Sequence, residues 1–300
     1  MSYIDTIADN KDLVTPGMSA CHGCGGELIL RRLLKVAGPN TVICIPPGCM
    51  AGAGVVGWSF DNGLKVPVHI TLLDNTAAFL SGVTNIYQRQ GRTDVNMVAM
   101  AGDGATADCG FQSLSGAAER GEKMLYVCYD NEGYMNTGFQ RSSTTNRGSR
   151  TSTTPVGSVI PGKPQHSKNL PYIMAMHNAE YVATASPAYM KDMIEKIEKG
   201  LAASKNGFAY LHIFSPCPTG WLHGPEVSID VSRKAVQSDY FQLFEVDKGV
   251  WRQTVANKKP ITLKEFVGPL KKYGHCSDAD IAALQENIDA RKSFLQKMIG

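Results

Sequence analysis

The residues best suited to chemistry in this 300-residue chain form two groups. The first is Gly102-Asp103-Gly104 together with Asp130-Asn131, and the second is a set of cysteines that lie beside glycine or proline: Cys21, Cys24, Cys49 and Cys217. Glycines let backbone N–H groups approach phosphate oxygens closely, while Asp and Asn supply the hard oxygen ligands that Mg²⁺ prefers. Thiolates from separate loops can hold an iron–sulfur cluster. The two groups together indicate a Mg²⁺-diphosphate site and an electron carrier on one chain.

The oxygen ligands follow two predicted strands. Val95 to Ala101 ends at the Gly-Asp-Gly motif, and Met124 to Tyr129 ends at Asp130-Asn131. Parallel strands end at one edge of a sheet, so Asp103 and Asn131 are expected to reach one ion. A lone Gly-Asp-Gly is more often a turn with a capping Asp, and the second strand end is what favours a metal site.

The cysteine spacing allows several interpretations. Cys21-His22-Gly23-Cys24 is a single C-x₂-C element before a helix, whereas a four-cysteine zinc site usually has two. A thioredoxin-like dithiol would use Cys21 and Cys24 alone, and inert buried thiols are a third alternative. The spacing favours an iron–sulfur cluster and leaves these alternatives open. Three other cysteines are expected to lie outside the cluster, the first two as core thiols: Cys44, Cys128 and Cys109.

Apolar runs alternate with helical patterns along the chain. The runs that predict strands are Thr41–Pro46, Val66–Leu72, Val95–Ala101, Met124–Tyr129, Tyr181–Thr184 and Phe208–Phe214. The expected helices are Glu27–Ala37, Thr76–Gln90, Phe111–Arg120 and Pro187–Ala203, the last with Ser186 as its N-cap. Nearly continuous apolar strands are typical of a sheet covered on both faces. The pattern predicts an α/β fold with a doubly wound, mostly parallel sheet and ligands at the carboxyl ends of its strands.

Two regions depart from this alternation. Arg141 to Lys168 is rich in Ser, Thr, Gly and Pro, and its place after the metal motif favours an active-site or interface loop. Residues 225–300 are expected to form a partly helical extension beyond a domain of residues 1–224. The extension should end in a helix from Asp278 to Met298, capped by Ser277 and Asp280. Its apolar stripe could pack on this chain or on a partner: Ile281, Leu284, Ile288, Leu295 and Met298.

Composition narrows the class of protein. A net charge of +3 offers no reason to expect nucleic-acid binding. No apolar run is long enough for a membrane span, and the first ten residues lack the apolar core of a signal peptide. A cytoplasmic location is therefore expected. In a reducing compartment, eight cysteines indicate metal ligation and buried thiols instead of disulfides.

The motifs resemble those of the β subunits of 2-oxoacid:ferredoxin oxidoreductases, the pyruvate:ferredoxin oxidoreductase family. The resemblance runs from Cys21 to Trp221, and its signatures are CHGCG (21–25), PGC (47–49), AGDGATADCG (101–110), YDNEGYMNTGFQRS (129–142) and SPCPTGW (215–221). It implies thiamine diphosphate, Mg²⁺ and a [4Fe-4S] cluster as cofactors. It also implies companion subunits: an α subunit that supplies the catalytic Glu and the substrate pocket, subunits of the γ/δ type, and ferredoxin as electron acceptor.

The resemblance also implies roles for individual residues. Cys21, Cys24, Cys49 and Cys217 would hold the cluster, and Mg²⁺ would be bound by Asp103, the Asn131 side chain and the Gly133 carbonyl. Asn136 would be the catalytic residue that donates hydrogen bonds to negative charge developing at the reacting carbon, although Asn-Thr-Gly is more commonly a plain turn. The residues expected to bind thiamine diphosphate are Gly102, Asp103, Gly104, Ala105, Asn131, Gly133, Asn136 and Thr137.

The family implies thiamine-dependent oxidative decarboxylation of a 2-oxoacid, with pyruvate and coenzyme A as the first expectation. Many pyruvate-type members have Thr-Gly-Cys followed shortly by Glu, whereas this chain has Pro47-Gly48-Cys49-Met50 and a glycine-rich stretch from Ala51 to Asn62. These departures keep oxalate, an arylglyoxylate or another 2-oxoacid open as substrate. A zinc-stabilised, non-redox thiamine-dependent decarboxylase or synthase is an alternative function, and a purely electron-carrying module is another.

Overall fold

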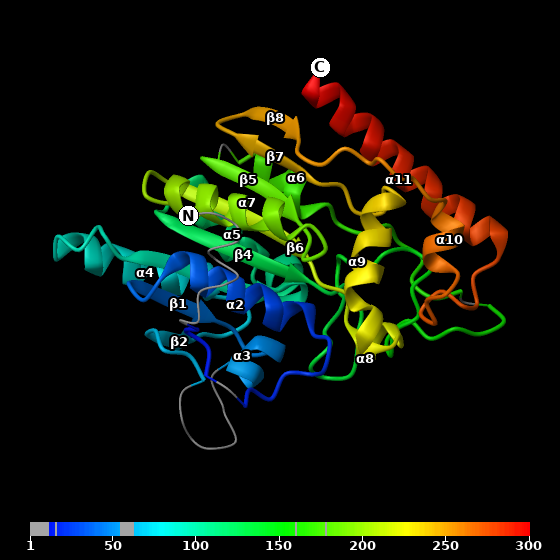
Figure 1. The fold of residues 1–300 in the computed structure, drawn as a ribbon, viewed down its shortest axis with the longest axis horizontal. Helices are drawn as coiled ribbons and strands as arrows, with labels where there is room; N and C mark the ends of the chain where they lie inside the picture. Colours follow the sequence, from blue (N-terminus) through cyan, green and yellow to red (C-terminus); the bar gives the residue numbers. More distant parts are fainter. Residues whose placement is uncertain (1–11, 16, 55–62, 160, 178) are drawn as a thin grey trace.

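An eight-stranded sheet forms the centre of the molecule (Figure 1). The computed structural model describes residues 12–15, 17–54, 63–159, 161–177 and 179–300. The strands are β1 (Thr41–Ile45), β2 (Val68–Ile70), β3 (Asn96–Gly102), β4 (Met124–Asp130), β5 (Tyr181–Ala185), β6 (Phe208–Phe214), β7 (Phe244–Asp247) and β8 (Val250–Gln253). Their spatial order is β2-β1-β3-β4-β6-β5-β7-β8. The first six in this order are parallel, so all six strands predicted from the sequence are confirmed as one parallel sheet.

Helices cover both faces of the sheet. The helices that the structure describes are α2 (Gly25–Ala37), α3 (Cys49–Gly54), α4 (Thr76–Arg89), α5 (Phe111–Glu119), α6 (Leu170–Ala175), α7 (Met190–Ala203), α8 (Pro218–Trp221), α9 (Ser228–Gln237), α10 (Leu263–Val267) and α11 (Asp278–Ile299). There are also a π-helical turn η1 (Ala105–Cys109) and a 3₁₀ turn η2 (Pro225–Val227). Helices α2 and α7 pack on one face, and α4, α5 and α6 pack on the other. Of the helices in the described ranges, none is long and apolar enough to span a bilayer.

Strand β1 illustrates why the apolar runs are continuous. Its side chains alternate between the two faces, with Ile43 and Ile45 in one core cluster and Val42 and Cys44 in the other. Because helices cover both faces, each of these residues is buried. Cys128 of β4 lies in the same cluster as Cys44, and both are fully buried, as expected for core thiols.

The region after residue 225 contributes to the sheet as well as to the helices. Strands β7 and β8 form an antiparallel hairpin that pairs with β5, and the sequence analysis did not predict them. Positive φ angles at Lys248 (48°) and Gly249 (82°) form the tight turn between them. A signal was present in the alternation of Phe244-Glu245-Val246-Asp247 before Lys-Gly, which is typical of a hairpin.

The C-terminal helix is confirmed, including its cap. Ser277 and Asp280 form the predicted capping box at the start of α11. Three residues of the predicted stripe are buried, Leu284, Ile288 and Leu295. The first two belong to a third core cluster that α11 forms with Phe214 and with helices α9 and α10. Most of the stripe therefore packs on this chain, whereas Met298 at its end is exposed.

The start of α7 differs from the prediction. Ser186 and Pro187 were expected to cap and open the helix, but α7 begins at Met190. The Tyr189 N–H donates to the Ser186 carbonyl at 2.9 Å, which closes a separate turn before the helix. Ser and Pro serve such a turn as readily as a helix start, which explains the error.

The carboxyl edge of the sheet brings the two motif groups together. Strands β1, β3, β4 and β6 are successive neighbours and parallel. The segments that follow them carry Cys49, Asp103, Asn131 and Cys217, respectively.

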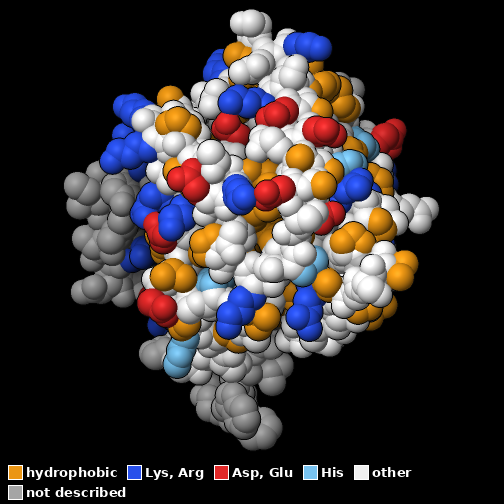
Figure 2. Space-filling model, turned by 90° about the vertical axis from the view of Figure 1, so that its right-hand side faces the viewer, with side chains coloured by type: hydrophobic (Ala, Val, Ile, Leu, Met, Phe, Trp, Pro, Cys, Tyr) orange, Lys and Arg blue, Asp and Glu red, His pale blue; other side chains and the backbone are white. Residues whose placement is uncertain are grey.

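At the molecular surface, acidic and basic side chains are intermixed on the face that Figure 2 presents.

Candidate functional site

Three oxygen-bearing groups meet where β3 and β4 end. One end of the Asn131 side-chain amide lies 2.8 Å from the Gly133 carbonyl oxygen and 2.9 Å from Asp103 Oδ1. Without a cation, that end must be the NH₂ group, because three oxygens would otherwise face one another. With a divalent cation between them, the same end would present its oxygen. Asp103, Asn131 and Gly133 are the ligands expected from the sequence, and their donor set fits Mg²⁺.

Asp103 is held by hydroxyl groups from the irregular segment that follows β4. The Ser142 and Thr144 hydroxyls both bond to Asp103 Oδ2, Thr144 at 2.9 Å. Burial raises the pKa of Asp103, and the nearby Asp130 carboxylate raises it further. A bound divalent cation would reverse this effect by supplying positive charge. The sequence analysis missed Ser142 and Thr144, although it expected segment 141–168 to act at an active site or interface.

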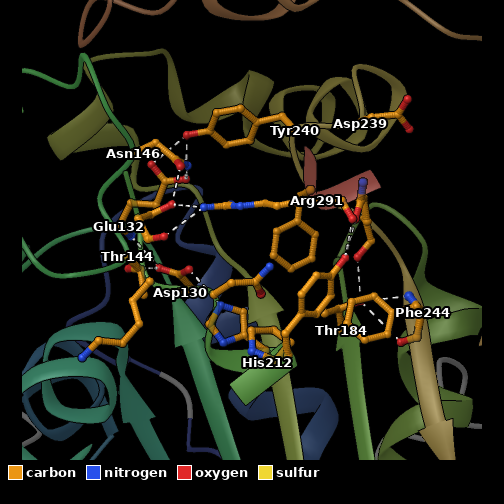
Figure 3. Close-up of a pocket in the computed structure, with 17 residues that line it drawn as sticks. Asp130, Glu132, Thr144, Asn146, Thr184, His212, Asp239, Tyr240, Phe244 and Arg291 are labelled. Atoms are coloured by element: carbon orange, nitrogen blue, oxygen red, sulfur yellow. Dashed lines mark hydrogen bonds and ion pairs between the residues drawn. The ribbon is translucent and has the colours of Figure 1, made fainter. Parts of the chain in front are cut away.

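Asp130 precedes Asn131 at the end of β4, and its carboxylate pairs with His212. Its Oδ2 is 2.8 Å from His212 Nε2 (Figure 3). On the other side of the ring, His212 Nδ1 is 2.8 Å from the Tyr210 hydroxyl. Burial acts to raise the pKa of Asp130, but the hydrogen bond and charge of His212 outweigh it, so that the pKa is lowered. Asp130 and Asp103 thus have pKa values shifted in opposite directions, with Asp130 the more readily ionised.

A cavity of about 120 Å³ opens beside these ligands. Its wall includes Gly102, Gly104, Ala105, Asn131, Gly133, Asn136 and Thr137, so that every residue predicted to bind the cofactor lines it except the fully buried Asp103. The rest of the described lining is Pro47, Gly48, Cys49, Leu73, Tyr129, Tyr134 and Met135. No acidic or basic side chain is among these lining residues.

Gly104 is required by its close approach to Tyr134. A Cβ atom at this position would lie 2.5 Å from two atoms of the Tyr134 ring, closer than packed atoms tolerate. We expect Gly104→Ala to displace Tyr134 from the cavity wall and to lower the free energy of unfolding by about 1–3 kcal/mol. Denaturant titration of the purified chain measures this effect.

Gly82 provides the matched control, because it lies in α4 and a Cβ there would meet nothing within 4 Å. Gly82→Ala should be neutral or stabilising by up to about 1 kcal/mol. Equal stability of the two variants would show that the Tyr134 contact imposes no constraint.

Asn136 lies in a short loop at the mouth of the cavity. The Tyr134 N–H donates to the Gln140 carbonyl at 2.9 Å and closes the loop. The Thr137 hydroxyl donates to the Gln140 side chain at 2.6 Å. The Asn136 side chain is exposed, and its amide has no hydrogen-bond partner within the described ranges. The loop is therefore closed by other residues, which leaves the Asn136 amide available to a ligand.

The four cysteines of the predicted cluster line one cavity of about 180 Å³. Cys24 is the N-cap of α2, Cys49 is the first residue of α3, and Cys217 is the N-cap of α8. The Gly220 N–H points to Cys217 Sγ at 3.3 Å. Helix N-termini stabilise thiolates, because their free N–H groups carry partial positive charge.

Without a bound cluster, Cys24 and Cys49 favour the protonated thiol. Burial is the main cause and the neighbouring thiols add to it, so that the pKa of Cys24 is raised to about 11 and that of Cys49 to about 12. Within the part of the chain that the structure describes, no three His, Cys, Asp or Glu side chains are placed to hold a single metal ion. A cubane cluster differs from a single ion, because each of its irons bonds one cysteine and its ligands stand apart. Binding of its irons would compensate the charge of the thiolates.

The two cavities share part of their walls. Cys49, Tyr129, Asn131 and Asn136 line both of them. The fold thus places the four-thiol cavity directly beside the cavity at the ends of β3 and β4.

Comparison with known proteins agrees with this arrangement. The C-terminal TPP-binding domain of thiamine pyrophosphate enzymes matches residues 64–213. The β subunit of the NADH-dependent phenylglyoxylate dehydrogenase of Aromatoleum evansii is 47% identical over 295 residues, which are 97% of this chain and 66% of that protein. Pyruvate synthase subunit PorB of Methanothermobacter thermautotrophicus is 40% identical over 284 residues, 93% of this chain and 96% of that protein. The chain belongs to the β subunits of the 2-oxoacid:ferredoxin oxidoreductase family.

A solved structure supports the same fold for this β subunit. The 2-oxoglutarate:ferredoxin oxidoreductase of Magnetococcus marinus, with 2-oxoglutarate, coenzyme A and succinyl-CoA bound, superimposes with a TM-score of 0.58 at 26% identity. The match covers 73% of this chain and 69% of that one. The predicted thiamine-binding α/β fold is thereby confirmed.

Proposed function

We propose that this β subunit carries the thiamine diphosphate, Mg²⁺ and [4Fe-4S] sites of a heteromeric enzyme that oxidatively decarboxylates a 2-oxoacid and passes the electrons to ferredoxin. The observation that carries the proposal is the wall shared by the two cavities, formed by Cys49, Tyr129, Asn131 and Asn136. A short separation between an electron donor and its acceptor is what such a reaction requires.

The chain's own residues would hold each group. Mg²⁺ would be bound by Asp103, the Asn131 amide oxygen and the Gly133 carbonyl, with Ser142 and Thr144 orienting Asp103. The diphosphate would lie along the backbone at Gly102, Gly104 and Ala105, beside Thr137. The cluster would be bound by Cys21, Cys24, Cys49 and Cys217. When bound, thiamine diphosphate supplies the decarboxylation chemistry and the cluster accepts electrons, while the protein provides placement and charge stabilisation.

Asn136 is the residue that we assign to the reacting centre. Its exposed amide lies where the two cavities meet. An amide donor fixed at that position would stabilise negative charge as it develops on the substrate.

Other chains must complete the site. Activation of thiamine diphosphate requires a Glu beside its aminopyrimidine ring, as the family resemblance implies, and no Glu is among the described residues that line the cofactor cavity. We assign this Glu and most of the substrate pocket to a companion α subunit, with γ/δ-type subunits and ferredoxin as the further partners. The β subunit purified alone is therefore expected to be inactive.

Sequence similarity favours an arylglyoxylate, such as phenylglyoxylate, over pyruvate as the substrate. Identity to the phenylglyoxylate dehydrogenase subunit exceeds that to the pyruvate synthase subunit, 47% against 40%. Many pyruvate-type members have a Glu shortly after the cysteine, whereas here Met50 and Gly52 follow Cys49 and line the four-thiol cavity. Pyruvate with coenzyme A remains the second candidate. Oxalate is the third candidate and would need cationic partners. The described lining of the two cavities contains neither Arg nor Lys, so these partners would have to come from the companion α subunit.

A substrate panel on the complex tests this proposal. The β subunit would be co-produced with its companion subunits under anaerobic conditions and assayed with phenylglyoxylate, pyruvate, 2-oxoisovalerate, 2-oxoglutarate and oxalate. Each assay would be run with and without coenzyme A, first with a low-potential dye and then with ferredoxin or NAD⁺ as acceptor. Fastest reduction with phenylglyoxylate supports the arylglyoxylate assignment, and fastest reduction with pyruvate overturns it. No reduction with any 2-oxoacid would overturn the proposed function.

A further inference from the structure

We propose that Glu132 is a positioning residue for the Mg²⁺-binding loop and that Lys272, from the C-terminal part of the chain, fixes it in place. The inference rests on the proposed function, because it concerns the geometry of the Asn131 and Gly133 ligands. Glu132 lies between these two residues in the sequence, and its carboxylate bonds to Lys272, Tyr240 and Asn146.

The Glu132 carboxylate is buried and fully engaged by residues remote in sequence. Lys272 Nζ forms an ion pair with Oε2 at 2.5 Å, and both side chains are almost completely inaccessible. The Tyr240 hydroxyl contacts the two carboxylate oxygens at 2.7 and 2.9 Å, and Asn146 Nδ2 donates at 3.0 Å. Figure 3 shows Tyr240 and Asn146 beside Glu132 above the strand ends. The side chain is thus held in a single position.

The backbone around Glu132 is held as well. The Thr145 hydroxyl donates to the Glu132 carbonyl at 2.7 Å, and Trp221 Nε1 donates to the Asn131 carbonyl at 2.9 Å. Glu132 itself has a φ of 61°, in the left-handed region that a residue with a side chain rarely adopts. These contacts impose the turn that directs the Asn131 amide and the Gly133 carbonyl to one point.

Lys272 also contacts the loop that carries a predicted cluster ligand. Its ammonium lies 3.2 Å from the centre of the Trp221 ring. Trp221 ends the short helix that Cys217 caps. One buried cation therefore contacts both the Glu132 side chain and the helix that follows Cys217.

Stability alone does not account for this arrangement. A buried ion pair loses hydration that its mutual attraction often fails to recover, and apolar replacements are frequently as stable. A left-handed non-glycine residue adds backbone strain, which is typically retained at functional sites. Here both features occur next to the three groups that fit a Mg²⁺ site, which indicates a positioning role.

The test is the Mg²⁺ dependence of cofactor binding by the co-produced complex. Apo complex would be titrated with Mg²⁺ at fixed thiamine diphosphate, and bound cofactor would be measured after rapid gel filtration. Glu132→Gln preserves the size of the side chain but removes its charge. It is expected to raise the half-saturating Mg²⁺ concentration about 10- to 100-fold, the range found when residues that orient metal ligands are changed. Tyr240→Phe removes the hydroxyl that bonds to Glu132 and should raise the half-saturating Mg²⁺ concentration by a smaller factor. This second variant also tests the inference if Glu132→Gln does not fold.

Lys196→Met is the matched control. Lys196 is a second buried lysine with an ion pair, to Asp192 at 2.7 Å, but it lies on α7 and contacts Thr184 and Thr254. The Lys196→Met variant should lower the melting temperature of the complex without changing its Mg²⁺ requirement. If Glu132→Gln and Tyr240→Phe match the wild type in Mg²⁺ requirement, or if Lys196→Met raises it equally, the inference is wrong. If the wild-type complex itself binds no thiamine diphosphate at any Mg²⁺ concentration, the proposed function fails instead.

Discussion

Asp103→Asn is expected to leave the complex without bound thiamine diphosphate. Asp103 is the only charged member of the three-ligand group, since Asn131 and Gly133 offer neutral oxygens. The described lining of the cofactor cavity carries no positive side chain that could hold the diphosphate without the ion. Loss of a direct ligand should exceed the roughly 10- to 100-fold loss in metal affinity found for residues that only orient ligands. Thiamine diphosphate content after gel filtration measures the effect.

The unfolding of the same variant distinguishes a ligand role from a structural one. Asp103 is fully buried, and burial and Asp130 raise its pKa, so its ionised form is disfavoured when no cation is present. A group whose pKa is raised on folding binds protons more readily in the folded state, and ionised Asp103 therefore costs stability as the pH rises above its unfolded pKa. The neutral Asn should leave the melting temperature of the apo protein at pH 7 unchanged or higher. A cofactor content equal to that of the wild type, or a large fall in apo stability, would contradict the assignment.

The parts of the site that could be predicted from the sequence are those set by single strand ends. Val95–Ala101 and Met124–Tyr129 are almost entirely apolar, with Asn96 as the polar exception, because helices cover both faces of β3 and β4. Once two such strands are taken as parallel neighbours, the residues after them must share an edge. The strand pattern alone was therefore enough to place Asp103 and Asn131 together.

Contacts that join distant segments could not be predicted in this way. Glu132 and Lys272 are 140 residues apart, and nothing in the local pattern around Lys271-Lys272 marks one lysine as buried. Likewise, the sequence predicts only that Ser142 and Thr144 belong to a polar loop. Their hydrogen bonds to Asp103 become apparent only in the folded structure. Hydrogen-bond partners of this kind depend on how loops cross the sheet edge, which hydrophobic periodicity does not record.

The region that departs from the pyruvate-type pattern borders the four-thiol cavity. Met50 and Gly52 line that cavity. Residues 55–62 of the glycine-rich stretch, with Trp58 and Phe60, lie outside the described residues.

Cys49→Ser is expected to remove the cluster from the β subunit while leaving thiamine diphosphate in place. Serine offers a hard hydroxyl of high pKa, whereas iron–sulfur clusters are held by soft thiolates. Anaerobically purified complex should lose about four iron atoms and their acid-labile sulfide per β chain, with the matching visible absorbance. Cofactor content should persist, since Cys49 lines the cofactor cavity but does not belong to the group that fits Mg²⁺.

The matched control for that change is Cys276→Ser. Cys276 is half-buried like Cys49, but it contacts Gly148 and His275 instead of the other thiols. Its replacement should leave the iron content unchanged.

Because Cys49 lines both cavities, Cys49→Ser should also separate cofactor binding from electron transfer. Substrate-dependent dye reduction should fall by at least about tenfold, while thiamine diphosphate stays bound. Wild-type iron content in Cys49→Ser would mean that the ligand set is wrong, and equal losses in both variants would mean that the cluster responds to general disturbance of the fold.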